Sequence, residues 1–280
     1  MKREDKSQSP PPEDIITHYA SGYEANRLET LDGKIDRERT RELLNRFLPP
    51  APAIVYDIGG GTGKHACWLA RRAYEVHLID IVPNHVELAR RESAMQPEHR
   101  LASAEVGDAC SLDLDDNSAD AALLFGPLYH LTDRLDRQRA LSEAYRILKT
   151  GGILMAAGIS RFASTLDGLR SEFLKDPEFF KIVKGDLNNG HHRNPTNNQN
   201  YFMETFFHHP DELKAEVTGA GFLESRVYGV EGPSWLAPKL DEWWNDEKQR
   251  DVLIWIARAL ESEPALSGIS AHLIVTGMKG

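Results

Sequence analysis

Cysteine, long apolar runs and basic runs are all scarce in this chain. Its 280 residues include only two cysteines, Cys67 and Cys110. We expect both to be small apolar fillers, with Cys67 on a buried helix face, because two isolated thiols provide neither a disulfide framework nor a metal-ligand set. No stretch of about eighteen apolar residues is present, which excludes a conventional membrane-spanning helix. The polar, proline-rich start from Met1 to Asp14 does not have the form of an export signal, so the sequence predicts a cytoplasmic protein.

The charge balance is acidic, with a formal net charge of -10. Tight binding to duplex nucleic acid or transfer RNA requires clustered lysines and arginines that displace counterions. The composition therefore argues against a nucleic-acid partner, although a local basic patch formed in three dimensions stays open. Hydrophobic residues make up 41% of the chain, which suits one α/β domain with a sizeable insertion or a small cap.

Strand-like apolar runs alternate with helix-like segments through the middle of the chain. Helices are expected at Ala66 to Arg72 and at Asp133 to Leu148, the second ended by Gly151 and Gly152. The expected strands are Ala53 to Val55, Glu75 to Asp80, a run ending at Val106, Asp120 to Phe125, Gly152 to Ala157, Phe222 to Val230 and His272 to Met278. This alternation predicts an α/β fold with a parallel, doubly wound sheet.

The most informative segment is a glycine turn between the first strand and the first of these helices. Gly59, Gly61 and Gly63 form G-x-G-x-G, and Asp57 precedes the first glycine by two residues. Such a turn lets a ligand approach bare backbone at the start of a helix. A dinucleotide fingerprint requires glycine where Lys64 stands, and a P-loop requires glycine where Ile58 stands.

The segment resembles the first motif of the class I S-adenosylmethionine (AdoMet)-dependent methyltransferases, which reads acid-x-G-x-G-x-G at the end of the first strand. A glycine-rich turn in some other α/β protein is the alternative. The resemblance implies a Rossmann-like, doubly wound, seven-stranded, mostly parallel sheet with an antiparallel last strand and a helical lid or cap. It also implies AdoMet as the cofactor and S-adenosyl-L-homocysteine as the product.

Acidic residues at the next two strand ends strengthen the resemblance. Asp80 ends the second strand, where a carboxylate can accept two hydrogen bonds from a ribose diol. Asp108 follows the third strand, where the family has an acid facing the adenine amino group, and the next N–H, of Ala109, faces a ring nitrogen. The resemblance thus assigns cofactor contacts to the turn, the second strand end and the third strand end: Asp57, Gly59, Gly60, Gly61 and Gly63; Asp80 and Ile81; and Asp108 and Ala109.

The fourth strand ends in Phe125-Gly126-Pro127-Leu128-Tyr129-His130-Leu131. In the resembled family this is where the acceptor meets the methyl group, so Phe125 and Gly126 are expected to close the methyl side. The run from Gly126 is similar to one in a group of bacterial class I methyltransferases that are mostly predicted to act on small molecules. Motifs of enzymes that methylate the exocyclic amines of bases or cytosine C5 are absent.

Two residues of this run are the candidate catalytic residues. His130 is the leading general base, because imidazole transfers protons near neutrality. A helix-capping role, or contact with the methionine end of the cofactor, is the alternative for His130. Tyr129 is expected to stack on the acceptor or hydrogen bond to it. The pairs His191–His192 and His208–His209 do not predict zinc, because no cysteine or carboxylate spacing supports them, and no metal is expected.

Two outlying segments have open alternatives. Tyr19, Tyr23 and Arg27 share one helical face, and the resemblance implies that this segment folds over the cofactor, with Tyr19 beside it and Arg27 pairing with its carboxylate. The alternative is an amphipathic helix with Arg27 in solvent. The tryptophans at 235, 243 and 244 either wall an acceptor pocket or pack a small cap.

These expectations divide the chain into five parts. They are a disordered tail at 1–12, a helical cofactor-covering segment at 13–50, an AdoMet-binding α/β core at 51–158, a lid insertion at 159–209, and the rest of the core at 210–280 with a helical insert at about 233–264. The polar stretch 188–200 belongs either to the lid or to a flexible surface loop.

The sequence predicts an AdoMet-dependent methyltransferase that modifies an O or N atom of a small molecule or short peptide. A protein or RNA methyltransferase and a non-catalytic AdoMet- or nucleotide-binding protein are the alternatives.

Overall fold

The computed structural model describes residues 31–196 and 198–280. The expected tail at 1–12 and the candidate cofactor contacts Tyr19 and Arg27 lie outside the described residues. No helix in the described ranges has the length and apolar character needed to cross a membrane.

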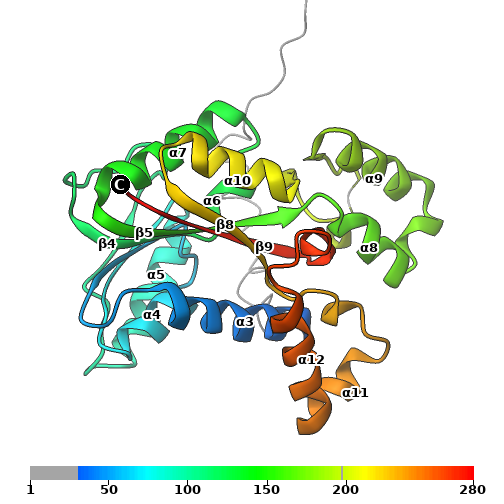
Figure 1. Ribbon diagram of the computed structural model, residues 1–280, viewed down its shortest axis with the longest axis horizontal. Coiled ribbons are helices and arrows are strands. Elements are labelled where there is room, and N and C mark those ends of the chain that lie inside the picture. Colours follow the sequence, from blue (N-terminus) through cyan, green and yellow to red (C-terminus); the bar gives the residue numbers. More distant parts are fainter. Residues whose placement is uncertain (1–30, 197) are drawn as a thin grey trace, which may run out of the picture.

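A mixed sheet forms the centre of the molecule (Figure 1). Five parallel strands stand in the order β3-β2-β1-β4-β5, β9 pairs antiparallel with β5, and β8 pairs antiparallel with β9. Their bounds are β1 Ile54–Ile58, β2 Glu75–Asp80, β3 Ser103–Val106, β4 Ala119–Leu124, β5 Leu148–Ser160, β8 Leu223–Gly229 and β9 His272–Met278. The predicted Rossmann-like, mostly parallel sheet with an antiparallel last strand is confirmed. The predicted number of seven strands is too low, because two further short strands extend the sheet beside the end of β5, so that the described part has nine.

Helices cover both faces of this sheet because its central strands are apolar on both sides. Leu123 packs into a core with helices α3, α4 and α5, and the next residue, Leu124, packs into a second core with α7 and α10. Figure 1 shows the two helical layers above and below the strands. Their bounds are α3 Leu31–Phe47, α4 Lys64–Ala70, α5 Pro83–Ala94, α7 Arg134–Ile147 and α10 Pro210–Gly219. This layering leaves the carboxyl ends of the parallel strands as the edge where loops gather.

The expected glycine stop after α7 is wrong. The helix ends at Ile147, and Leu148 is already extended, with ψ 141°, and pairs with Ala119 of β4. Gly151, with φ 79°, lies within β5 near a register shift of the β4–β5 pair. Strand pairing therefore replaces the glycine cap as the reason why this helix ends.

The segment 159–209 adds two short strands that we did not predict. β7, Thr205–His208, pairs parallel with the end of β5, and β6, His191–His192, pairs antiparallel with β7. Two helices precede them, α8 at Ala163–Arg170 and α9 at Pro177–Asn189. Asn194 of the polar stretch donates hydrogen bonds from Nδ2 to the carbonyls of Asn198 and Phe202. The end of this segment is thus fastened to the sheet.

The second helical addition follows β8 and comprises α11, Leu240–Asn245, and α12, Glu247–Leu260. Leu240 and Leu253 pack against Ile35 of α3 in a separate small core, with Trp243 and Trp244 at its margin. Figure 1 shows this pair projecting below the sheet. These two tryptophans therefore pack a cap, as one of the two expected alternatives.

Candidate active site

Two adjoining pockets open at the carboxyl ends of the parallel strands. The first is lined by residues that include Gly59, Gly61, Asp80, Ile81, Asp108, Ala109, Gly126, Tyr129 and His130. The second is lined by residues that include Asp36, Asp57, Gly59, Gly60, Gly61, His65, Phe125, Tyr129 and His272. Gly59, Gly61 and Tyr129 line both, so the two pockets are two parts of one site on either side of the glycine turn.

The glycine turn needs glycine for conformational and steric reasons. Gly59 has φ 73°, and a Cβ atom there would lie 2.5 Å from Pro127 Cδ. A Cβ on Gly60 would lie 2.8 Å from the carboxylate of Asp57. Gly63, with φ 79°, occupies the left-handed position that precedes α4. The chain therefore turns tightly at the end of β1 and leaves bare backbone facing the site.

Asp57 is a buried acid with an unfilled hydrogen-bonding position. Its side chain ends β1 and is 1% exposed, and no described residue donates a hydrogen bond to Oδ2. Burial and the negative charge of Asp80 raise the pKa of Asp57 to about 7. A buried, unsatisfied carboxylate oxygen beside a pocket fits a cationic or hydrogen-bond-donating ligand.

Asp80 connects the end of β2 to the glycine turn that follows β1, and it lines the first pocket. Its Oδ2 accepts a hydrogen bond from Gly61 N at 2.8 Å, and its Oδ1 accepts one from Val82 N at 2.8 Å. Asp108, after β3, accepts a hydrogen bond from Cys110 N at 2.9 Å. Each carboxylate oxygen has lone pairs beyond these bonds, so both acids can also bind a ligand in the pocket.

Tyr129 and His130 lie on the short helix α6, Pro127–His130. The Tyr129 hydroxyl donates to the carbonyl of Phe125 at 2.9 Å, which places the tyrosine between the two pockets. His130 lines the first pocket, where Asp80 and Asp108 lie, and is not part of the lining of the second. Its predicted role as a general base stays a prediction, since this position is on the side of Asp108.

The four histidines at 191, 192, 208 and 209 serve separate contacts. His192 binds Asp186 through Nδ1 and the carbonyl of Tyr201 through Nε2. His208 is fully buried beside Glu216, and His209 caps α10 in a capping box with Glu212. His209 thus lies at the entry of a helix, and none of the four lines either pocket. Cys67 and Cys110 are free thiols, of which Cys67 is buried and Cys110 partly exposed.

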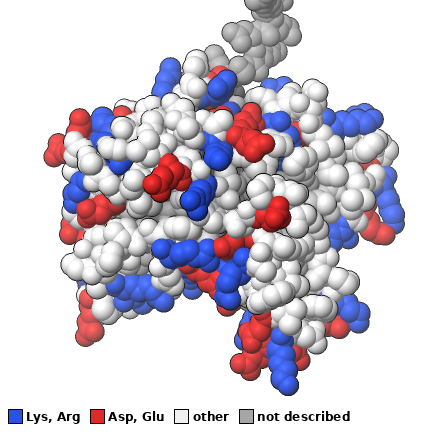
Figure 2. Space-filling model, viewed as in Figure 1, with Lys and Arg blue, Asp and Glu red and all other residues white. Residues whose placement is uncertain are grey.

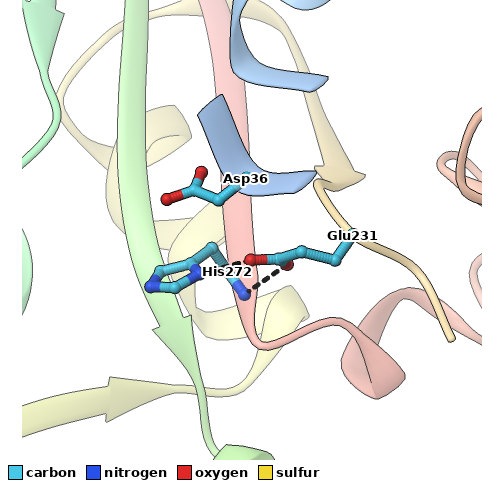
Figure 3. Close-up of side chains that lie close together, drawn as sticks. All are labelled: Asp36, Glu231 and His272. Carbon is cyan, nitrogen blue, oxygen red and sulfur yellow. Dashed lines mark hydrogen bonds and ion pairs between the residues drawn. The ribbon is translucent and has the colours of Figure 1, made fainter. Parts of the chain in front are cut away.

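Sequence reasoning missed a cluster at the edge of the second pocket. Carboxylate oxygens of Asp36 and Glu231 and a ring nitrogen of His272 lie within 4.8 Å of one another (Figure 3). Asp36 comes from α3, Glu231 from the loop that follows β8, and His272 from the start of β9, so only the tertiary fold brings them together. The antiparallel pairing of the last two strands could have indicated part of this cluster, because it places the residues after β8, including Glu231, beside His272 at the start of β9.

A comparison with known protein families decides the class. Residues 56–156 match the model of a methyltransferase domain. These residues form a methyltransferase domain, and the protein is an AdoMet-dependent methyltransferase. Its cofactor is AdoMet and its product S-adenosyl-L-homocysteine. The orphaned oxygen of Asp57 and the glycine turn fit a cofactor that carries a sulfonium and an ammonium group.

Similar proteins span most of the methyltransferase. The ubiquinone/menaquinone biosynthesis C-methyltransferase UbiE of Dinoroseobacter shibae is 26% identical over 74% of this chain and 81% of its own. An O-methyltransferase of Pyrenophora dematioidea is 33% identical over 52% of this chain and 57% of its own. Phosphoethanolamine N-methyltransferase 2 of Haemonchus contortus shares the fold, with a TM-score of 0.54 at 16% identity over 87% of this chain and 52% of that chain.

Proposed function

We propose that this methyltransferase transfers the methyl group of AdoMet to an O or N atom of a small molecule or short peptide. The observation that carries the proposal is the pair of pockets that share Gly59, Gly61 and Tyr129. In this proposal one AdoMet molecule spans both. Its adenosine would fill the first, and its methionine half and methyl group the second.

In this arrangement each strand end holds one part of AdoMet. Asp80 would accept hydrogen bonds from the ribose diol, with Ile81 beside the ring. Asp108 and the N–H of Ala109 would bind the adenine edge. Asp57 and the glycine turn would hold the methionine half, and Phe125 and Gly126 would close the methyl side. Tyr19 and Arg27 remain predicted contacts of the same cofactor.

The bound sulfonium supplies an activated methyl group, so the protein must align the acceptor and exclude water. The second pocket is suited to this task, because Phe125 and Ile274 give it apolar walls and Asp57 gives it negative charge near the expected sulfonium. Tyr129 has its hydroxyl fixed on the carbonyl of Phe125. Its ring is therefore positioned to orient an acceptor beside the methyl group.

A small acceptor is supported by the relatives and by the surface. UbiE and phosphoethanolamine N-methyltransferase act, by their names, on small molecules. On the face in Figure 2, lysines and arginines are interspersed with acidic residues, and no continuous basic surface covers the described part of that face. A protein or RNA substrate is the less favoured alternative, because RNA requires clustered positive charge.

A carbon acceptor is a second candidate, favoured by one observation. UbiE, which matches this chain over 74% of its length, is named a C-methyltransferase. A hydroxylated ring could be methylated at oxygen or at a ring carbon, and both sites become more nucleophilic when the hydroxyl is ionised.

The test is methyl transfer from tritiated AdoMet to a panel of phenols, hydroquinones, primary amines and carboxylic acids, with peptide and transfer RNA pools in parallel. Incorporation into a small acceptor supports the proposal, and mass spectrometry of the product then distinguishes oxygen, nitrogen and carbon. Incorporation only into the transfer RNA pool would overturn it.

A further inference from the structure

We propose that His272, held by Glu231, is the general base of this enzyme and that the acceptor carries a weakly acidic hydroxyl, as in a phenol or an enol. The inference rests on the proposed function, because it concerns the second pocket of the same site. The general-base role is thereby assigned to His272, on the methyl side of the glycine turn, instead of to His130.

Glu231 is a rigid, buried carboxylate that orients the imidazole. It is 1% exposed, and its Oε1 lies 2.5 Å from His272 Nδ1. Its Oε2 accepts hydrogen bonds from His272 N at 2.9 Å and from Ser270 Oγ at 2.7 Å. Ser270 Oγ is itself fixed by the N–H of Glu231 and that of Gly232. Three bonds on one carboxylate determine where the ring points.

The contact with Glu231 also selects the tautomer of His272. A carboxylate accepts the proton of Nδ1, so the basic lone pair belongs to Nε2, on the side of the ring away from Glu231 (Figure 3). The same division of roles makes a histidine–carboxylate pair an effective base in other enzymes, where the acid orients the ring and stabilises the imidazolium.

Asp36 places a second carboxylate at the imidazole. One of its oxygens accepts a hydrogen bond from Thr40 Oγ1 at 3.0 Å, and the side chain is 8% exposed. Two buried carboxylates near one ring stabilise the charged form that proton uptake creates. The other titratable groups that line this pocket are Asp57, Lys64, His65 and Tyr129.

The location connects the base to the chemistry. His272 lines the second pocket together with Asp57, Gly59 and Phe125, the residues expected to surround the methionine half and the methyl group. His272 begins β9 and is paired with Ile159 of β5, so its backbone position is set by the sheet rather than by a loop.

The proposed step is balanced in atoms and charge. His272 Nε2 takes the proton of the acceptor O–H, and an oxygen lone pair forms the new bond to the methyl carbon. The bond from the methyl carbon to sulfur breaks, and its electron pair stays on sulfur, which gives neutral S-adenosylhomocysteine. The imidazolium then releases its proton to water.

The main rival is a divalent cation held by Asp36, Glu231 and His272. Because His272 Nδ1 already binds Glu231 Oε1, such a site would use His272 Nε2 and the remaining carboxylate lone pairs as ligands. A cation there would occupy the lone pair that a general base needs, so the two assignments predict opposite effects of chelation.

The test compares wild type with His272→Ala, Glu231→Gln and the exposed control His99→Ala. Each protein is first titrated calorimetrically with AdoMet, and then assayed with tritiated AdoMet on 4-methylphenol and on 4-nitrophenol, which is ionised at pH 8. We expect AdoMet binding within about twofold of wild type for all three variants. His272→Ala should lose on the order of 10²-fold or more in rate on 4-methylphenol but far less on 4-nitrophenol. Imidazole in the buffer should restore part of the loss.

Glu231→Gln tests the positioning role. It should lower kcat on 4-methylphenol while leaving KM nearly unchanged, and it should shift the pH profile of the rate. His99→Ala should match wild type throughout.

Four results would overturn the proposal. One is an equal loss on both phenols in His272→Ala, because a base is not needed for an ionised acceptor. Another is loss of wild-type activity in EDTA with recovery in Mg²⁺ or Zn²⁺, which would show a cation site. A third is no methylation of either phenol by wild type, which rejects the acceptor class. If amines or carboxylic acids are methylated in that case, the proposed function survives without the further inference. If AdoMet itself does not bind, the proposed function and the further inference both fail. The fourth is full activity of His272→Ala on 4-methylphenol.

Discussion

The carboxylate of Asp80 accepts a hydrogen bond from the backbone N–H of Gly61 at 2.8 Å. This contact ties the end of β2 to the glycine turn that follows β1. One acid therefore shapes the turn and lines the pocket assigned to adenosine. Because Asp80 both binds the turn and lines the pocket, the end of β2 and the glycine turn form a single binding unit.

Replacement of Asp80 by alanine should weaken AdoMet binding by about 1–3 kcal/mol, because both the ribose hydrogen bonds and the anchor of the turn are lost. Calorimetric titration with AdoMet measures the effect. Asp113→Ala, at an exposed acid between β3 and β4, is the matched control and should bind as wild type does. Unchanged binding by the Asp80 variant would remove the ribose assignment.

The pKa of Asp57, raised from 3.8 to about 7 by burial and by Asp80, predicts a pH dependence of stability. Between pH 4 and pH 7 the unfolded chain has lost a proton that folded Asp57 keeps. Raising the pH should therefore lower the free energy of unfolding of the ligand-free protein, by up to about 1.4 kcal/mol per pH unit from this group.

Urea unfolding of wild type and Asp57→Asn across this pH range isolates that contribution, which the variant lacks. AdoMet affinity should show the opposite trend in wild type, since ionised Asp57 attracts the cationic cofactor, and should strengthen from pH 6 to pH 8. Identical pH slopes in the two proteins would show that Asp57 does not titrate in this range.

The glycine turn predicts a sharp difference between two glycine-to-alanine substitutions. Gly59→Ala places a methyl group 2.5 Å from Pro127 Cδ at a φ of 73° and should destabilise the fold by roughly 1–3 kcal/mol and abolish AdoMet binding. Gly219→Ala in α10 meets no atom within 4 Å and should be neutral or stabilising by up to about 1 kcal/mol. Thermal unfolding with and without AdoMet tests both. Equal behaviour of the two variants would contradict the close approach at Gly59.

Arg137 and Glu216 form a buried ion pair between α7 and α10. Two Arg137 nitrogens donate to the Glu216 carboxylate, the closest at 2.8 Å, and both side chains are almost fully buried. Arg137→Met leaves the glutamate charge buried and should cost about 3–5 kcal/mol, whereas Arg137→Met with Glu216→Leu should recover much of the loss. Chemical denaturation of both proteins measures this. A double variant no better than the single one would show that the pair is not the source of the effect.

The same pair predicts acid sensitivity. Burial alone would raise the pKa of Glu216, but hydrogen bonds from His208 and Arg137 lower it from 4.5 to about 2. A lowered acid pKa stabilises the fold fully above pH 4.5, and the contribution is lost as pH falls from 4.5 toward 2. Unfolding free energies of wild type should therefore fall more steeply over that interval than those of the double variant. Parallel curves would contradict the assigned pKa.

The parts of the fold predicted best are those where local pattern and packing agree. The bounds Glu75–Asp80 and His272–Met278 match the observed strands β2 and β9, because apolar runs of that length have one stable environment in a covered sheet. The acids and glycines at the strand ends also came together as expected in two shared pockets, since parallel strands bring their carboxyl ends to one edge.

The parts that were missed depend on contacts between distant segments. β6 and β7 are two and four residues long, and only pairing with β5 and with each other makes them strands. Asp36, Glu231 and His272 come from three segments far apart in the chain, and none carries a local motif. The sequence also does not show which pocket His130 faces, because that depends on the path of α6; the structure has it lining the first pocket, and its role as a general base stays a prediction.

The most direct test of the central claim is a calorimetric titration of the wild-type protein with AdoMet, S-adenosylhomocysteine and NAD⁺ in parallel. The two-pocket site around Gly59, Gly61 and Tyr129 predicts micromolar binding of both adenosyl ligands and no heat from NAD⁺. Binding of NAD⁺ in their place, or no binding by any of the three, would contradict the account.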